Sequence, residues 1–225
     1  MKILSWNCNG KFREKFSILN FDYDIAIIQE CENPKTSNDK NYIKFAKNYI
    51  WFGENNNKGL GIFAKDTIIL NNNNWPHYCL RHFISAEINK SFNILAVWAS
   101  KPYIEEYYIY QSINEEKYNN KMVIIGDFNS NVIWDKKHQT RNFSNVISKL
   151  EKIGLTSAYH FVNKEEYGKE TQKTFYLYRH TDKGYHIDYA FADRDNIKTF
   201  KILNENKWLK YSDHIPILLE LNTDI

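Results

Sequence analysis

The pattern of apolar and polar residues along the chain predicts many short β-strands. Short apolar runs that are bounded by polar or glycine-containing segments are typical of strands buried in a sheet. We expect such strands at residues 2–6, 25–29, 50–53, 59–64, 86–88, 93–98, 122–125, 174–177, 187–192, 199–203 and 216–221. The strands at 86–88 and 93–98 are expected to form a hairpin around residues 89–91, and residues 71–74 a polar turn.

Longer segments with helical periodicity lie between these strands. Residues 141–153 show it best, because apolar side chains recur at three- and four-residue spacing and Gly154 follows as a stop signal. Residues 38–49 and the aromatic-rich residues 103–118 are also expected to be helical, and an amphipathic connection spans residues 12–19.

The order of these elements predicts an α+β fold. Strands and helices are interleaved without a Pro-, Gly- or Ser-rich linker and without an internal repeat. Several strands return as hairpins, which favours two mixed sheets packed face to face with helices on the outside. A chain of 225 residues, 43% of them apolar, can bury a sizeable core. We therefore expect one domain over residues 1–225.

Composition narrows the binding partners and the cellular compartment that we expect for this chain. Its net charge of +3 permits a polyanionic partner without demanding one, since strong nucleic-acid binders usually carry a clearer basic stripe. Three widely spaced cysteines form no metal-binding pair and indicate a reducing compartment. The first residues lead straight into a strand without the features of a signal peptide, and no apolar stretch is long enough to span a membrane. We expect a cytoplasmic protein without membrane contact and with no evident obligate protein partner.

Polar side chains cluster where the apolar runs begin or end, and a rigid scaffold presents reactive groups at such strand ends. Their carboxylate and amide oxygens suit a hard cation such as Mg²⁺ or Mn²⁺. Such an ion polarises a phosphoryl oxygen, a carboxylate can activate the attacking water, and a histidine can donate to the phosphoryl oxygens. Metal-assisted phosphoester hydrolysis is therefore predicted for the set Asn7, Asn9, Glu30, Asp127, Asn129, Asp188, Asp213 and His214.

Each cluster also has a purely structural interpretation. Residues 7–10 can form a simple turn, and residues 127–130 an Asx-type turn. Glu30 and residues 213–214 can be solvated strand ends, whereas Asp188 inside an apolar strand needs a partner if it is buried. The structural interpretation requires all of these coincidences in one order, so the functional one is favoured.

Together the motifs resemble those of the endonuclease/exonuclease/phosphatase superfamily, which includes exonuclease III-type AP endonucleases and DNase I-like nucleases. The resemblance covers essentially the whole chain and rests on residues 6–10, 29–30, 126–130, 186–189 and 212–216. It implies a four-layer α/β/β/α sandwich, two mixed β-sheets flanked by helices, with the site at one edge. It also implies Mg²⁺ or Mn²⁺ as the cofactor.

The resemblance implies a metal-binding role for three of the matching residues. Glu30 is expected to be a principal metal ligand, and Asp213 a second carboxylate on the metal side. Asn7 is expected to hold the metal or its water, with Asn9 close to it.

Four further residues are implied to be catalytic. Asp127 is expected to position or activate the attacking water, and Asn129 to bind the scissile phosphate. His214 is expected to contact the phosphate and stabilise the transition state. Asp188 would accept a hydrogen bond from His214, which fixes the tautomer of the imidazole and favours its charged form.

Candidates for contact with the substrate are Asn9, Trp98, Arg179 and His186. Arg179 can equally belong to an exposed strand edge. His186 lies two residues before Asp188, so in a continuous strand both side chains would point to one face. The family commonly has a His or Tyr where this chain has Trp98, and an indole cannot accept a proton. Either Trp98 packs against the substrate or another residue supplies that phosphate contact.

The first functional hypothesis is a Mg²⁺- or Mn²⁺-dependent nuclease or phosphodiesterase that cleaves DNA or RNA. Residues 7–10 and Arg13 most resemble the AP endonuclease branch, although the lysine often found after the family's glutamate is missing after Glu30. The alternative is a phosphatase or phosphodiesterase acting on a small phosphorylated molecule. A catalytically silent binding module on the same fold is a third hypothesis, and the retention of all the acidic site residues and His214 argues against it.

Overall fold

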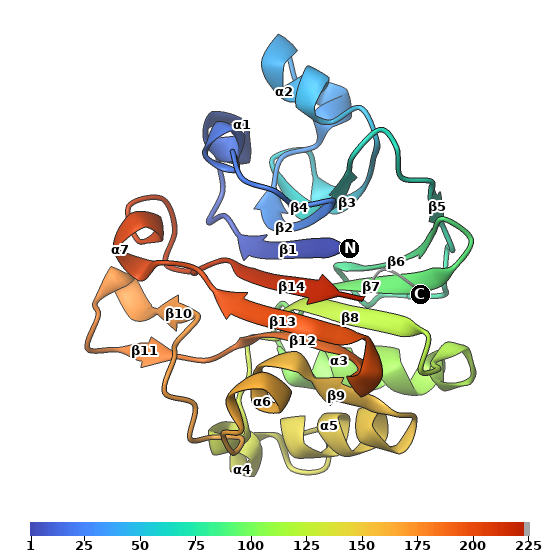
Figure 1. Cartoon of the computed structure of the whole chain (residues 1–225), viewed down its shortest axis with the longest axis vertical. Coiled ribbons are helices and arrows are strands. Elements are labelled where there is room, and N and C mark those ends of the chain that lie inside the picture. The colour runs from blue at the N-terminus through green and yellow to red at the C-terminus, as the bar shows by residue number, and fades with distance from the viewer. Residues whose placement is uncertain (223–225) are drawn as a thin grey trace.

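The computed structural model describes residues 1–222 and shows two mixed β-sheets packed face to face (Figure 1). The first sheet contains, in spatial order, β13 (Ile197–Ile202), β14 (Ile217–Leu221), β1 (Lys2–Asn7), β2 (Ile25–Cys31), β4 (Lys58–Ala64) and β3 (Tyr49–Asn55). The second contains β5 (Leu70–Asn72), β6 (Phe83–Ile88), β7 (Phe92–Trp98), β8 (Met122–Asp127), β12 (Asp188–Asp193) and β9 (Leu155–Ser157). A separate hairpin of β10 (Phe175–Tyr176) and β11 (Gly184–Tyr185) lies at one edge of the sandwich.

Helices on the outer faces of both sheets complete four layers (Figure 1). Outside the first sheet lie α1 (Phe12–Lys15) and α2 (Lys40–Phe45), and outside the second lie α3 (Ile104–Ile113), α4 (Asp135–His138) and α5 (Phe143–Lys152). Helix α6 (Ala158–Asn163) packs against β12 and β13, and α7 (Glu205–Trp208) precedes β14. Short 3-10 helices are η1 (Phe16–Ile18), η2 (Pro34–Thr36), η3 (Glu115–Lys117), η4 (Val132–Trp134), η5 (Leu177–Arg179) and η6 (Arg194–Asn196).

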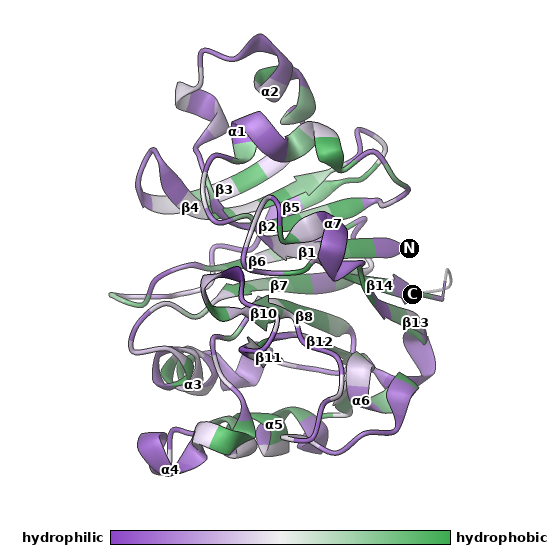
Figure 2. Cartoon of the chain, turned by 90° about the vertical axis from the view of Figure 1, so that its left-hand side faces the viewer, coloured by the Kyte–Doolittle hydropathy of each residue, from purple (hydrophilic) through white to green (hydrophobic). Residues whose placement is uncertain are grey.

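The predicted sandwich is therefore confirmed, and hydrophobic burial explains its layers. Apolar side chains of both sheets form one continuous core between them, and colour by hydropathy shows the strands largely green and the outer loops largely purple (Figure 2). Helix α5 buries the face that its periodicity predicts, including Phe143, Val146 and Leu150, in a second core outside β8 and β12. Each such side chain contributes about 1.5–3 kcal/mol of transfer free energy on full burial.

Several predicted boundaries differ from the structure. The polar turn predicted at residues 71–74 is wrong at its start, because Asn71 pairs with Glu87 in the short edge strand β5. β5 lies at the edge of its sheet and only Leu70 among its residues is apolar, so the sequence pattern does not indicate a strand there. The strand predicted at 174–177 stops at Tyr176, since Tyr178 adopts a left-handed backbone with φ 55°. Helix α2 begins two residues later than predicted because Asp39 caps its first turn, and it ends at Phe45 because the backbone leaves the helical conformation at Ala46.

The topology brings the ends of six strands to one edge of the sandwich. β1 runs parallel to β2, and β7 runs parallel to β8, so the carboxyl ends of each pair lie side by side. β12 is antiparallel to β8 and begins there, with Asp188 opposite Asp127. β14 is antiparallel to β1 and also begins at this edge. Figure 2 looks onto this edge, whereas the N-terminus lies at the opposite edge (Figure 1).

Candidate active site

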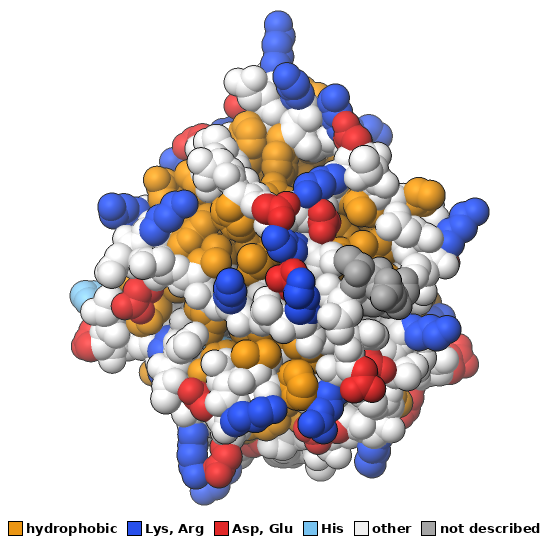
Figure 3. All heavy atoms as spheres, in the orientation of Figure 1, with side chains coloured by type: hydrophobic (Ala, Val, Ile, Leu, Met, Phe, Trp, Pro, Cys, Tyr) orange, Lys and Arg blue, Asp and Glu red, His pale blue; other side chains and the backbone are white. Residues whose placement is uncertain are grey.

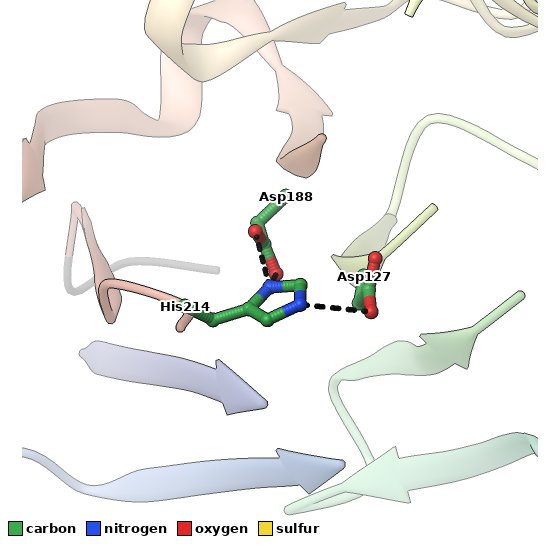
Figure 4. A group of neighbouring side chains, drawn as sticks. All are labelled: Asp127, Asp188 and His214. Atoms are coloured by element: carbon green, nitrogen blue, oxygen red, sulfur yellow. Dashed lines mark hydrogen bonds and ion pairs between the residues drawn. The ribbon is translucent and has the colours of Figure 1, made fainter. Parts of the chain in front are cut away.

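Asp127, His214 and Asp188 form a buried cluster where β8, β12 and the segment before β14 meet (Figure 4). His214 Nδ1 lies 3.0 Å from Asp188 Oδ2, and its Nε2 lies 3.8 Å from Asp127 Oδ2. The imidazole therefore stands between two carboxylates, with Phe175 packed on its ring at a centroid distance of 4.8 Å. All three residues are almost inaccessible, so their charges act on one another with little screening by water.

Burial and neighbouring charges raise the pKa values of both Asp127 and His214 above their ordinary values, for different reasons. Burial, with help from Asp188, raises the pKa of Asp127 to about 7, although His214 and two hydrogen bonds oppose the shift. Burial would lower the pKa of His214, but Asp188 and Asp127 outweigh it and raise the pKa to about 10. At neutral pH the histidine is a cation, and Asp127 exchanges its proton in the range where a general base is useful.

Two asparagines position the Asp127 carboxylate. The Asn7 amide donates to Asp127 Oδ2 at 3.0 Å, and the Asn129 side chain donates to the same oxygen at 2.9 Å. The backbone N–H of Asn129 donates to Asp127 Oδ1 at 2.8 Å. Asn129 has φ 47°, a conformation that asparagine tolerates better than most residues. The turn predicted at residues 127–130 thus exists, and it holds the carboxylate rather than replacing its function.

Glu30 reaches the site because β2 contains a bulge. The register of β2 against β4 shifts between Gln29 and Cys31, and Glu30 adopts φ 64° between two buried neighbours. An extra residue in a strand turns one side chain out of the regular alternation. The Glu30 side chain remains 17% exposed, and its Oε1 lies 3.5 Å from the Asn7 amide nitrogen. Asn7 therefore links Glu30 to Asp127.

Asp213 and His214 are fixed to the end of β1 by Ser212. The Ser212 hydroxyl donates to the Asn7 carbonyl at 2.7 Å and accepts from the His214 backbone N–H at 3.0 Å. The Asn9 amide donates to Asp213 Oδ1 at 3.1 Å. Trp6 adds a hydrogen bond from its indole to the His214 carbonyl at 3.2 Å. Residues 6–9 and 212–214, far apart in sequence, form one rigid corner.

Lys15 holds the same corner together through hydrogen bonds to three backbone carbonyls. Its ammonium donates to the carbonyls of Cys8, Gly10 and Tyr211 at 2.6, 2.8 and 2.8 Å. Burial lowers the pKa of this amine, and Arg179 adds to the effect. The loop that carries Asn9 is thereby tied to the residue two positions before Asp213.

Replacing Lys15 by Met should loosen this corner. Loss of the ammonium leaves three partly buried carbonyls without their donor, which should cost about 2–3 kcal/mol in the free energy of unfolding. Displacement of Asn9 and Asp213 should lower kcat/KM by about tenfold, because small misplacements in an active site are expensive. Urea unfolding and steady-state kinetics measure the two effects. Lys11→Met, a change to an exposed lysine of the same loop, is the matched control, and equal behaviour of the two variants would contradict this role of Lys15.

Trp98 lies at the end of β7, opposite Asp127 in the parallel register, but only 7% of its surface is exposed. The His82 ring packs on it at a centroid distance of 4.2 Å, and the Lys58 ammonium lies 5.5 Å from the ring centroid. Little of the indole is left for a substrate. Of the two alternatives for this position, the burial of Trp98 favours the second, in which another residue supplies the phosphate contact.

Arg179 and His186 occupy contrasting places. Arg179 is exposed in the β10–β11 connection beside the site, with φ 61° and a hydrogen bond of 3.4 Å to the Lys210 carbonyl. His186 is 1% exposed, and Tyr159 packs on its ring at 4.3 Å. Its expected contact with a substrate is wrong, because β12 begins only at Asp188 and the assumed strand alternation does not extend back to residue 186. His186 Nδ1 bonds the Gln172 carbonyl instead, at 3.0 Å.

The oxygen donors at this edge suit a divalent cation. Asp127, Asp188 and His214 offer ligand atoms within 4.8 Å of one another, a possible metal-binding cluster. Beside it, Glu30 already attracts a positive group, since the Lys58 ammonium lies 2.9 Å from its Oε2. Carboxylates and amides without a thiolate form the type of donor set that Mg²⁺ and Mn²⁺ prefer.

Sequence reasoning missed Lys15 and Lys58 as residues of the site. Each reaches its partners through tertiary packing. Lys58 carries one local signal, because it begins β4, the neighbour of β2, directly before Gly59. Lys15 carries none that we can identify.

A four-layer sandwich with a buried Asp–His–Asp cluster and further acidic and amide groups at one edge defines a phosphoester hydrolase of the DNase I-like class. The chain belongs to the Endonuclease/Exonuclease/phosphatase family, whose model matches residues 4–214. No curated protein matches the sequence. No helix of residues 1–222 has both the length and the apolar character needed to cross a membrane.

Three solved structures with the same fold share 19% or less of their sequence with this chain. A 3' phosphatase, NExo, from Neisseria, bound to a product DNA hairpin, superposes with a TM-score of 0.72 at 19% identity, covering 99% of each chain. The 3'-5' exonuclease NExo from Neisseria meningitidis gives 0.71 at 19% identity, covering 99% of this chain and 100% of that one. An AP endonuclease from Archaeoglobus fulgidus gives 0.68 at 16% identity with the same coverage.

Proposed function

We propose that the protein is a Mg²⁺- or Mn²⁺-dependent nuclease that hydrolyses phosphodiester bonds of nucleic acid. The observation that carries the proposal is the buried Asp127–His214–Asp188 cluster, joined through Asn7 to the partly exposed Glu30. These groups combine a base, a cationic donor and acidic oxygens at one edge of a rigid sandwich. Phosphoester hydrolysis requires that combination.

Each residue of the cluster has a task that its geometry supports. Asp127 accepts the proton of the attacking water, and Asn129, bonded to Asp127, faces the scissile phosphate. His214 donates from Nε2 to a phosphoryl oxygen, because Nδ1 is engaged by Asp188. Asp188 holds the ring in that orientation and favours its charged form.

The proposed metal ligands are Glu30, Asn7 and Asp213. A cation held there screens the phosphoryl oxygens and the charge that develops on them. Coordination by His214 is disfavoured, because a metal ligand must lose its proton and the two carboxylates hold the proton on this imidazole. Asp127 and Asp188 therefore serve the histidine and the water rather than the cation.

Nucleic acid is proposed as the substrate on two grounds. The similar structures are those of a 3' phosphatase bound to DNA, a 3'-5' exonuclease and an AP endonuclease. Asn9 and the exposed Arg179 stand beside the cluster, where they can contact the substrate next to the cleaved bond.

Removal of a terminal phosphate from a nucleic-acid end is a second candidate function. On the face shown in Figure 3, basic side chains alternate with acidic and apolar ones, so that face of the described residues carries no continuous basic stripe. The observation that favours this candidate is the similar structure of a 3' phosphatase bound to a product DNA hairpin.

A metal-dependent cleavage assay tests both candidates. Purified protein is incubated with labelled single- and double-stranded DNA, abasic DNA, RNA and a 3'-phosphorylated oligonucleotide, with Mg²⁺, with Mn²⁺ and with EDTA. Chain cleavage that EDTA abolishes supports the nuclease, and release of only the terminal phosphate supports the second candidate. Hydrolysis of small phosphoesters alone, such as bis-p-nitrophenyl phosphate or p-nitrophenyl phosphate, would contradict a nucleic-acid substrate. Asp127→Ala protein, prepared in parallel, identifies contaminating nuclease.

The pH dependence of kcat/KM should be bell-shaped. The rate should rise as Asp127 loses its proton near its pKa of about 7, because only the carboxylate accepts a proton from water. It should fall as His214 loses its proton near its pKa of about 10, because the neutral ring at Nε2 no longer donates as a cation. Bound metal adds positive charge and should move the acid limb to lower pH.

Asp188→Asn tests the assignment of the alkaline limb to His214. Removal of the Asp188 charge takes away a cause of the raised pKa of His214, so the alkaline limb should move to lower pH by one unit or more, about 1.4 kcal/mol per unit. The limbs belong to a coupled pair, so they are compared as macroscopic values. An unchanged alkaline limb in this variant would show that His214 is not the group that limits the rate at high pH.

A further inference from the structure

Lys58 contacts both Glu30, a proposed metal ligand, and the ring of Trp98. Its ammonium lies 2.9 Å from Glu30 Oε2 and 5.5 Å from the centroid of the Trp98 ring. Lys58 begins β4 in the first sheet, whereas Trp98 ends β7 in the second. The lysine therefore bridges the two sheets at the edge that carries the catalytic cluster.

No other lysine or arginine within residues 1–222 forms an ion pair with one of the acidic site residues. Lys15 is held by backbone carbonyls, Arg13 pairs with Glu14 and Glu32, and Arg81 pairs with Glu54 and Glu106. The Lys58 side chain is 48% exposed, so its ammonium can leave Glu30 without crossing a packed core. The Trp98 ring restricts where it can go, because a cation gains by staying over the face of an indole.

The Lys58–Glu30 pair and a metal ion compete for one carboxylate. When a divalent cation binds Glu30, an ammonium a few ångströms away is repelled by like charge. The same ammonium then has an attractive alternative, because a substrate brings phosphate oxygens to the metal side and these accept hydrogen bonds from cations. Trp98, directly opposite Asp127 in the register, keeps the displaced ammonium beside the reacting phosphate.

We infer that Lys58 is a phosphate-binding residue of this site that neutralises Glu30 until metal and substrate arrive. In the free protein it lowers the affinity for the cation, and in the complex it contacts a phosphate oxygen of the substrate. This supplies a phosphate contact at a position where Trp98 is too buried to make one. The inference rests on the proposed function for its substrate and on the Lys58–Glu30 contact for its location.

Lys58→Gln should move two binding constants in opposite directions. Mn²⁺ alone, titrated calorimetrically into the protein, should bind about tenfold more tightly, because the competing like charge is gone. A single-stranded oligonucleotide, titrated in Ca²⁺ to suppress cleavage, should bind about tenfold more weakly at low salt, and the slope of log K against log salt should fall in magnitude by about 0.7. Loss of packing alone would not tighten metal binding.

Two variants make the result specific. Lys58→Arg keeps the charge and should retain both wild-type values within about threefold, although its geometry differs. Lys90→Gln removes an exposed lysine from the turn between β6 and β7 and should change neither value. Circular dichroism confirms that each variant is folded.

The outcomes separate Lys58 from the proposed substrate. If Lys58→Gln leaves Mn²⁺ affinity unchanged or weaker, or leaves the salt slope unchanged while the wild type binds oligonucleotides, the inference is overturned. If the wild type cleaves and binds no nucleic acid, inorganic phosphate titrated in the presence of Mn²⁺ replaces the oligonucleotide. Tighter Mn²⁺ and weaker phosphate binding in Lys58→Gln would then uphold the role of Lys58 and reject the nucleic-acid substrate. Unchanged phosphate binding would reject both.

Discussion

Asp127→Asn should lower kcat by about 10³-fold while leaving the fold and the metal affinity in place, because a positioned general base contributes about 10²–10⁴-fold. The amide has nearly the same shape as the carboxylate, but it cannot accept a proton from water. The three hydrogen bonds that Asp127 receives from Asn7 and Asn129 come from donors, so one amide oxygen can keep part of the network. Steady-state kinetics at saturating metal measure kcat, a Mn²⁺ titration measures the metal affinity, and a thermal melt tests whether the fold is retained.

The far end of the same strand pair offers a matched control. Asp193, the last residue of β12, caps the backbone N–H of Asp195, a bond that asparagine can also make. Asp193→Asn should therefore retain wild-type activity and stability. An Asp127→Asn protein with more than about a tenth of wild-type activity would assign the base to another group. A variant that loses Mn²⁺ binding would instead make Asp127 a metal ligand.

The layered fold and the position of the site follow from local features of the sequence. Residues 2–6 and 122–125 are strands in the structure, and the polar residues after them meet because β1 and β8 pack against each other across the two sheets and end at the same edge. A strand that is buried on both faces must end where polar residues begin, so strand ends and reactive groups coincide. This explains how Asn7 and Asp127 are found together without knowledge of the pairing.

Features that depend on irregular backbone could not be predicted in the same way. The bulge that turns Glu30 outward appears only as a register shift between β2 and β4. The placement of His186 failed because strand alternation applies only inside a strand, and β12 begins two residues later. Lys15 finds its carbonyl partners across a separation of up to 196 residues, which local patterns do not encode.

The positions of the residues around the proposed metal site are therefore harder to predict from local sequence than those of the catalytic cluster. Asp127 and His214 each stand in a local turn, with Asn129 and Ser212 respectively, and Asp188 lies at the start of an apolar strand. Glu30 depends on a bulge, and its partner Lys58 lies on a neighbouring strand. Binding affinity for the cation and the substrate is accordingly expected to vary more with distant substitutions than the chemical step does.

His214→Gln should lower kcat by about 10²–10⁴-fold, because a neutral amide can donate to the phosphoryl oxygen but carries no positive charge to stabilise the transition state. The ring is packed against Phe175 and held by Asp188, so its shape as well as its charge is lost. Stability therefore has to be measured beside kcat. A His214→Gln protein with wild-type melting temperature and reduced kcat isolates the chemical role.

Asp188→Asn tests whether Asp188 acts only through that histidine. Alone, it should reduce kcat by less than His214→Gln does, since the imidazole remains and only its charged form is weakened. In the His214→Gln background it should add nothing further, because residues that act as one unit are not additive. A double variant whose losses multiply would mean that Asp188 contacts the metal or the substrate directly. In that case the cluster of Asp127, Asp188 and His214 would itself be the cation site, and Glu30 would be secondary.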